Sequence, residues 1–284
     1  MSLFARRIVP AVISVLAALA ALAPAAASAG TFVGLGDSYA AGPGIPFYEQ
    51  PYGCIRSTNN YAHHAAATLG LPLRDVSCSG AETEDMTQTQ GVTPGPNPPQ
   101  FGALSPHTDV VTIHIGGNDI GFSSIAEDCF DPQPADPRTP CRDKYVVNGR
   151  DEVSARIAET APKVAAVIQG IHERAPAAKV LVLDYPAIFP HEGGGCWPQL
   201  PVADGDVPWL RSKQEELNAM LAEQAAANHA TLVGAYAASR GHDACQLPGI
   251  RWVEPLVPAS PAAPVHPNIF GMLAMAKLVV AAAR

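Results

Sequence analysis

The segment 109-DVVTIHI-115 predicts a strand that is buried on both faces. It is short, apolar and rich in β-branched residues, and Gly116 and Gly117 stop it directly. A strand that lacks the alternation of apolar and polar residues is typical of a parallel sheet, because helices cover both faces of such a sheet. This segment therefore favours an α/β fold.

Further predicted strands and helices alternate along the chain on either side of this segment. The strands are expected at Thr31–Leu35, Arg74–Ser77, Lys179–Leu183 and Thr231–Val233, and the helices at Asn60–Leu69, Glu152–Ala175, Pro208–Asn228 and Asn268–Ala283. Alternation of this kind predicts a parallel sheet with helices on both faces. We see no internal repeat and no interdomain linker, so we expect residues 30–284 to form a single domain.

The first 29 residues are typical of a secretory signal peptide. Arg6 and Arg7 give a basic start, Ile8–Leu22 is an apolar run, and Ala27-Ser28-Ala29 supplies the small residues of a cleavage site. The apolar run is short for a membrane span, which needs roughly 20 residues, so a stable membrane anchor is not expected. We predict a secreted protein cleaved after Ala29. The export route stays open, although the residues around the arginines fit the general secretory route better than the twin-arginine route.

The composition indicates which partners the protein can bind and whether its cysteines form disulfides. The formal net charge is −8, which makes nucleic acid a poor candidate for a ligand. Six cysteines in an exported chain favour disulfides, and the absence of a C-x-x-C pair argues against a zinc site. Among the pairing schemes we favour the sequential one, because each pair then brackets a loop-rich segment. These pairs are Cys54–Cys78, Cys129–Cys141 and Cys196–Cys245.

The segment 34-GLGDSYAAG-42 places Ser38 just after the first predicted strand. The carboxyl edge of a parallel sheet is where α/β proteins bind ligands, and glycines there allow a sharp turn and close approach of a substrate. The alternative is a simple turn in which Asp37 caps a helix. The segment is not a Gly-x-Ser-x-Gly nucleophile elbow, because Ala40 occupies the place of the last glycine.

Two further segments supply candidate groups at the same edge. Asn118 follows the buried strand in Gly116-Gly117-Asn118-Asp119, and its amide could donate to a developing oxyanion. Gly80 follows the strand at Arg74–Ser77, and its N–H could do the same. The alternative for Gly116–Asp119 is a simple turn, because Gly-Asn-Asp is favourable turn chemistry.

His266 stands directly before Pro267 and the last predicted helix. Pro267 is well placed for a helix start, so His266 would lie in a fixed loop that can reach Ser38. By contrast, His114 lies inside the buried strand, where a structural role is favoured over a catalytic one.

These four segments, in this order, resemble the GDSL/SGNH hydrolase superfamily, and in particular its secreted actinobacterial lipases and esterases with three disulfides. Gly36-Asp37-Ser38 is similar to the nucleophile block of that family, and Gly80, Gly116–Asp119 and His266 match its later blocks. The resemblance implies a three-layer α/β/α sandwich around a five-stranded parallel sheet, which is a flavodoxin-like arrangement. It also implies sequential disulfides, and an oxyanion hole formed by Ser38, Gly80 and Asn118.

The chain departs from the family pattern at Ala263, where the family places an aspartate three residues before the histidine. Some similar esterases orient the histidine with a main-chain carbonyl, and we expect the carbonyl of Ala263 to do this for His266. The alternative is a remote carboxylate, Glu254 or Asp243, that folds back to complete a triad.

These features predict a lipase or carboxylesterase that cleaves acyl esters through a Ser38–His266 acyl-enzyme mechanism, acts as a monomer and needs no metal or organic cofactor. The alternatives are a phospholipase or a polysaccharide acetyl esterase on the same fold, or a secreted binding protein without catalysis. A serine peptidase is a further class, but nothing indicates a peptide-binding cleft. Aromatic residues in two loops, Pro43–Gly53 and Ala187–Trp209, could wall an apolar acyl groove or merely cover the sheet, and we favour the groove. They are Phe47, Tyr48, Phe189, Trp197 and Trp209.

Overall fold

The computed structural model describes residues 30–131, 133 and 137–284. The predicted signal peptide therefore lies outside the described residues. A five-stranded parallel sheet forms the centre, in the order β2-β1-β3-β6-β7. Its strands are β1 (Thr31–Gly36), β2 (Leu73–Asp75), β3 (Thr108–His114), β6 (Lys179–Leu183) and β7 (Thr231–Val233). This arrangement confirms the predicted α/β class and the five-stranded parallel sheet.

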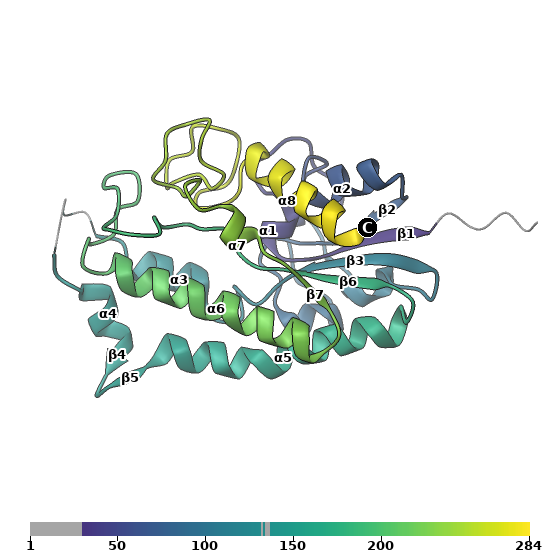
Figure 1. The fold of residues 1–284 in the computed structure, drawn as a ribbon, viewed down its shortest axis with the longest axis horizontal. Coiled ribbons are helices and arrows are strands. Elements are labelled where there is room, and N and C mark those ends of the chain that lie inside the picture. The colour runs from purple at the N-terminus through teal and green to yellow at the C-terminus, as the bar shows by residue number, and fades with distance from the viewer. Residues whose placement is uncertain (1–29, 132, 134–136) are drawn as a thin grey trace, which may run out of the picture.

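Helices cover both faces of the sheet, so the fold has the predicted three layers (Figure 1). Helices α2 and α8 pack together on one face, and α5 and α6 pack together on the other. The helices are α1 (Ser38–Ala41), α2 (Tyr61–Leu69), α3 (Phe122–Asp128), α4 (Pro140–Tyr145), α5 (Glu152–Arg174), α6 (Val207–Ala227), α7 (Ala235–Ala238) and α8 (Ile269–Ala283). Single turns of 3₁₀-helix occur at Tyr52–Cys54, Thr83–Met86 and Gln100–Ala103, and β4 (Val146–Val147) pairs with β5 (Arg150–Asp151) as a small hairpin.

Strand β3 lies at the middle of the sheet, as its apolar sequence predicts. All of its residues except Asp109 are buried. It pairs with β1 on one side, where Gly36 lies opposite His114, and with β6 on the other, where Ile113 lies opposite Val182. Because the strands are parallel and in register, the loops that follow them open at one edge of the sheet.

The start of α8 is fixed by a side-chain cap two residues after His266. The Asn268 side chain accepts hydrogen bonds from the N–H groups of Phe270 at 2.9 Å and Gly271 at 3.1 Å. Asn is among the favoured N-cap residues because its side-chain oxygen satisfies N–H groups that lack a partner in the first helical turn. Asn268 is fully buried, so the cap also anchors the loop that carries His266.

Three disulfides join Cys54 to Cys78, Cys129 to Cys141, and Cys196 to Cys245. This pairing is the sequential scheme that the sequence predicts. Across the described residues, no helix is both long and apolar enough to cross a membrane.

Candidate active site

Ser38 is the first residue of α1, two residues after the end of β1, and it is positioned by a tight turn. Gly36 has a φ of +136°, and a Cβ atom there would lie 2.3 Å from the carbonyl oxygen of His114 on the neighbouring strand. A glycine is therefore required where the chain leaves β1. The next residue, Asp37, caps α1 by accepting from the Tyr39 N–H at 2.9 Å. The helix cap that the sequence predicts as the alternative role of this segment is therefore present. It occurs together with a serine at the edge of the sheet.

His266 lies against Ser38, with 2.8 Å between its Nε2 atom and the Ser38 Oγ atom. Its Nδ1 atom lies 2.8 Å from the carbonyl oxygen of Pro264. A carbonyl can only accept, so the proton sits on Nδ1 and Nε2 is left to accept from the serine hydroxyl. Burial lowers the pKa of His266 below its ordinary value, and the bond to Pro264 opposes this shift in part. The ring is therefore neutral at physiological pH and can act as a base.

The carbonyl that orients His266 belongs to Pro264, and the prediction of Ala263 was wrong by one residue. The Ala263 carbonyl instead accepts from the backbone N–H of His266, at 3.2 Å. The difference arises at Val265, whose φ of +59° places it in the left-handed region. The chain turns there, which brings the carbonyl of Pro264, two residues before the histidine, to the Nδ1 atom of its ring.

Neither candidate carboxylate reaches the histidine ring. Glu254 is fully buried, lies 2.7 Å from the Arg251 guanidinium, and accepts from the Asn268 amide at 2.7 Å. The carboxylate of Asp243 accepts from the backbone N–H of Cys245 at 3.0 Å. Among the described residues, the partners of the His266 ring nitrogens are Ser38 and Pro264. The geometry is that of a dyad oriented by a main-chain carbonyl.

Asn118 lines a cavity that Ser38 and His266 also line. Its Nδ2 atom donates to the carbonyl of Ala81 at 2.9 Å, which fixes the amide and leaves its second N–H available. The next residue, Asp119, accepts from both the N–H and the hydroxyl of Thr83. These bonds join the loop after β3 to the loop after β2.

Gly80 lies in that second loop, in a turn with a φ of +80°, a conformation that favours glycine. The N–H of Cys78 donates to the carbonyl of Gly36 at 3.0 Å, which holds the turn against the end of β1. Within the described part of the chain, the N–H groups of Gly80 and Ser38 donate to no backbone carbonyl. Gly80 does not line the cavity around Ser38, so its role in an oxyanion hole stays a prediction.

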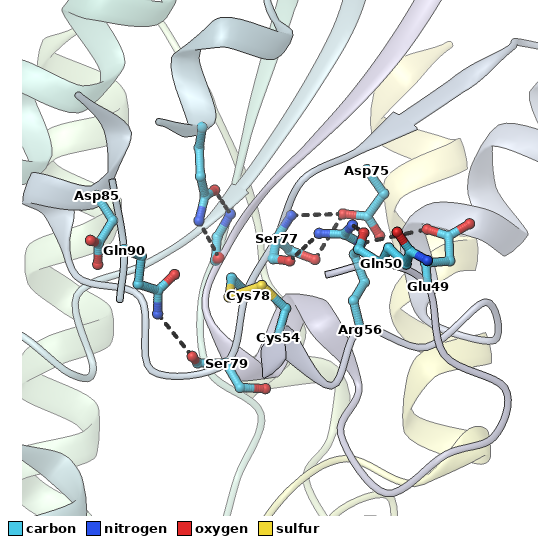
Figure 2. Close-up of a disulfide and its surroundings, with 12 residues drawn as sticks. Glu49, Gln50, Cys54, Arg56, Asp75, Ser77, Cys78, Ser79, Asp85 and Gln90 are labelled. Carbon is cyan, nitrogen blue, oxygen red and sulfur yellow. Dashed lines mark hydrogen bonds and ion pairs between the residues drawn. A yellow bond between two sulfur atoms is a disulfide. The ribbon is translucent and has the colours of Figure 1, made fainter. Parts of the chain in front are cut away.

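The disulfide Cys54–Cys78 fastens the segment between β2 and Gly80 (Figure 2). Around it, the Ser79 N–H donates to the carbonyl of Cys54 at 3.0 Å, and the Gln90 amide donates to the carbonyl of Ser79 at 2.9 Å. On the other side, the Arg56 guanidinium donates to the carbonyl of Ser77 at 2.7 Å. Disulfide and hydrogen bonds together fix a turn that has no regular secondary structure.

A buried network beneath the dyad was not predicted from the sequence. The Tyr185 hydroxyl donates to the Asp37 carboxylate at 2.5 Å and accepts from the Gly117 N–H at 2.8 Å. Burial raises the pKa of Asp37 to about 7, and the hydrogen bonds from Tyr185 and from the Tyr39 N–H offset part of that rise. The position of Tyr185, two residues after β6, was the available signal, since residues after parallel strands meet at one edge.

An apolar cavity of about 160 Å³ opens beside Ser38 and His266. Six of its apolar lining residues come from α3, α5, α6 and the loop between β6 and α6: Ile125, Val153, Phe189, Leu200, Leu210 and Leu217. Of the five aromatic residues expected to wall a groove, Phe189 alone lines this cavity. Phe47, Tyr48 and Trp197 are exposed, and Trp209 is buried in a stack on Tyr145. The loop 43–53 therefore contributes nothing to the cavity wall.

His114 is fully buried in β3, and its ring packs 4.4 Å from that of Tyr185 and 5.6 Å from that of Tyr39. Neither ring nitrogen has a hydrogen-bond partner among the described residues. Burial lowers the pKa of His114 to about 3, so this histidine is a neutral part of the core.

Comparison with known proteins defines the class. Residues 35–274 match the GDSL-like Lipase/Acylhydrolase family. The chain belongs to this family and is an ester hydrolase by class. Among curated proteins it is similar to Lipase 2 of Streptomyces coelicolor, with 41% identity over 253 residues that cover 87% of this chain and 83% of that protein.

Solved structures agree with this assignment. The chain is similar to a phospholipase A1 from Streptomyces albidoflavus NA297, with a TM-score of 0.74 and 26% identity over 90% of this chain and 100% of that one. It is equally similar to an extracellular lipase from Streptomyces rimosus, with a TM-score of 0.74, 27% identity and the same coverage.

Proposed function

We propose that the protein is a secreted lipase or carboxylesterase that cleaves acyl esters through a Ser38–His266 dyad. The observation that carries the proposal is the 2.8 Å contact between Ser38 Oγ and His266 Nε2, at the mouth of an apolar cavity. A serine hydroxyl is a weak nucleophile on its own and needs an adjacent base. Among the described residues that line the cavity, no other basic side chain is hydrogen-bonded to that hydroxyl.

The proposed reaction proceeds in two acyl transfers. His266 Nε2 takes the proton from Ser38 Oγ while that oxygen attacks the ester carbonyl carbon. The oxyanion that forms is stabilised by the N–H groups of Ser38 and Gly80 and by the Asn118 amide. The imidazolium then gives its proton to the leaving alcohol, and the acyl group stays on Ser38. Water repeats the sequence, releases the acid and restores the serine.

The proposed substrate has an apolar acyl chain. The cavity beside Ser38 is lined by aliphatic and aromatic side chains from α3, α5 and α6, and such surface is covered more favourably by hydrocarbon than by water. A phospholipid is the second candidate, supported by the similarity to a protein whose structure is that of a phospholipase A1. A polysaccharide acetyl ester would leave most of the apolar wall unused.

Secretion and domain organisation belong to the same proposal. A basic and then apolar segment precedes Ala29, three disulfides cross the described chain, and one similar structure is that of an extracellular lipase. We expect residues 30–284 to be the mature, single-domain protein. N-terminal sequencing of the exported protein should begin at Gly30.

A hydrolysis series tests the proposed function. p-Nitrophenyl esters from acetate to palmitate, then emulsified triglyceride and phosphatidylcholine, would be offered to the wild type and to Ser38→Ala. We expect kcat/KM to rise with acyl chain length until the cavity is filled, and to vanish in Ser38→Ala while the fold is retained. The highest kcat/KM on acetylated polysaccharide would overturn the proposed substrate. Full turnover in Ser38→Ala would overturn the proposed mechanism.

A further inference from the structure

Tyr39 links the short helix that carries Ser38 to the loop that carries His266. Its side chain is buried, and its hydroxyl donates to the carbonyl oxygen of Val265 at 2.6 Å. The Tyr39 ring lies 4.9 Å from the ring of His266, and the Tyr185 ring meets it edge-on at 5.0 Å. The tyrosine is thus held by neighbours and in turn contacts the residue just before the base.

Val265 has a conformation that needs external support. Its φ of +59° lies in the left-handed region, where a β-branched side chain is strained and persists only if the surroundings hold it there. This conformation folds the chain so that the Pro264 carbonyl meets Nδ1 of His266 at 2.8 Å. Contacts that hold Val265 in this conformation therefore also keep the proton of His266 on Nδ1.

The hydrogen bond from Tyr39 falls on the peptide group that sets the direction of the ring. The carbonyl of the Val265–His266 peptide accepts from Tyr39, and the N–H of the same peptide donates to the Ala263 carbonyl at 3.2 Å. Both ends of this peptide are thus fixed. Loss of the Tyr39 bond would leave a partly buried carbonyl without that donor and free the peptide to rotate.

We infer that Tyr39 is a positioning residue for the base: its hydroxyl holds the strained Val265 turn that presents the Pro264 carbonyl to His266. This inference rests on the proposed Ser38–His266 mechanism. It goes beyond that mechanism because it gives the residue next to the nucleophile a role in orienting the base. The charged side chains nearby have other partners, since Glu254 pairs with Arg251 and Asp37 bonds Tyr185.

Tyr39→Phe removes the hydroxyl and keeps the ring contacts. We expect kcat to fall about ten-fold, the scale of one hydrogen bond, with KM within about two-fold. The acidic limb of the kcat/KM profile should also move to lower pH, because the bond to Pro264 raises the pKa of His266 and would be weakened. A wild-type kcat together with a wild-type acidic limb would overturn the inference.

A second substitution tests the strain directly. Glycine adopts a φ near +59° without the steric cost that valine has. Val265→Gly in the Tyr39→Phe background should therefore bring kcat back to within about three-fold of the wild type. If kcat stays at the level of Tyr39→Phe, the hydroxyl does not act by holding this turn, and the inference is wrong.

A spectroscopic measurement separates this inference from the proposed function. The wild type should show a slowly exchanging proton NMR resonance for the Nδ1–H of His266, and Tyr39→Phe should lose it, whether or not any ester is cleaved. Tyr61→Phe, which removes the hydroxyl of another fully buried tyrosine, is the matched control and should keep the resonance and kcat. Absence of Ser38-dependent hydrolysis in the wild type would refute the proposed function, whereas an unchanged resonance in Tyr39→Phe would refute the role of Tyr39.

Discussion

The Oγ atom of Ser38 lies 2.8 Å from the Nε2 atom of His266, although 228 positions separate the two residues. Ser38 begins α1 two residues after the end of β1, and His266 lies in the loop before α8, whose start is capped by Asn268. The contact therefore depends on two local structural features, the glycine turn at Gly36 and the N-cap of α8. Neither feature takes part in the proposed chemistry, but each positions one residue of the dyad.

Asn118→Ala should lower kcat by about 10²–10³ if the amide donates to the oxyanion. In the wild type, one N–H of the amide is held by the Ala81 carbonyl, so the other can point at a substrate without further ordering. Steady-state kinetics on a dissolved ester would measure the effect, with Asn228→Ala at the far end of α6 as the control. A change in KM at constant kcat would make Asn118 a binding or turn residue.

Glu254→Gln and Asp243→Asn should each leave kcat within a few-fold of the wild type, because neither carboxylate contacts the His266 ring. Glu254→Gln should still lower the free energy of unfolding, by about 1–3 kcal/mol, because Arg251 loses its buried charged partner. Kinetics and urea unfolding of the same preparations separate the two effects. A loss of kcat near 10⁴ in a folded variant would instead indicate a carboxylate that completes a triad.

Much of the sheet could be predicted from the sequence, since its buried strands have a strong local signal. The β-branched run at Asp109–Ile115 and the strand at Lys179–Leu183 correspond to β3 and β6. The short helices α1, α3, α4 and α7 were not predicted. They have four to seven residues, too few for helical periodicity to appear, and tertiary contacts stabilise them instead.

The site was predictable only where the signal was carried by residue type and position. Ser38, Asn118 and His266 follow strands or precede a helix, so the topology alone brings them together. The orienting carbonyl could not be assigned from spacing, because any residue has a carbonyl and its direction depends on the φ of Val265. The hydrogen bonds of Tyr39 and Tyr185 depend likewise on side-chain directions that no local pattern encodes.

His114→Phe should make the protein less sensitive to acid. The pKa of His114 is about 3 in the fold, against about 6.5 in an unfolded chain. Between these pH values the unfolded state binds a proton that the folded state does not, so stability falls as the pH drops, by up to about 1.4 kcal/mol per pH unit. Urea unfolding between about pH 7 and about pH 4 should give a shallower loss in His114→Phe. Equal losses in the two proteins would contradict this.

Leu217→Trp should shorten the acyl chain that the enzyme prefers. Leu217 is buried in α6 and lines the cavity beside Ser38, so a larger side chain would occupy space that the proposed acyl group needs. We expect kcat/KM on a decanoate ester to fall at least about ten-fold and that on an acetate ester to stay within about three-fold. The acetate ester serves as the internal control for folding. Equal losses on both esters would indicate that the acyl chain does not enter this cavity.

Covalent labelling with a fluorophosphonate tests the central claim most directly, because the reagent reacts with a serine that an adjacent base activates. The mature protein would be labelled, digested and mapped by mass spectrometry, with His266→Ala and Ser38→Ala treated in parallel. The account predicts one equivalent of label on the peptide that contains Ser38, strongly slowed labelling in His266→Ala and none in Ser38→Ala. An unlabelled wild type, or label on another serine, would contradict it.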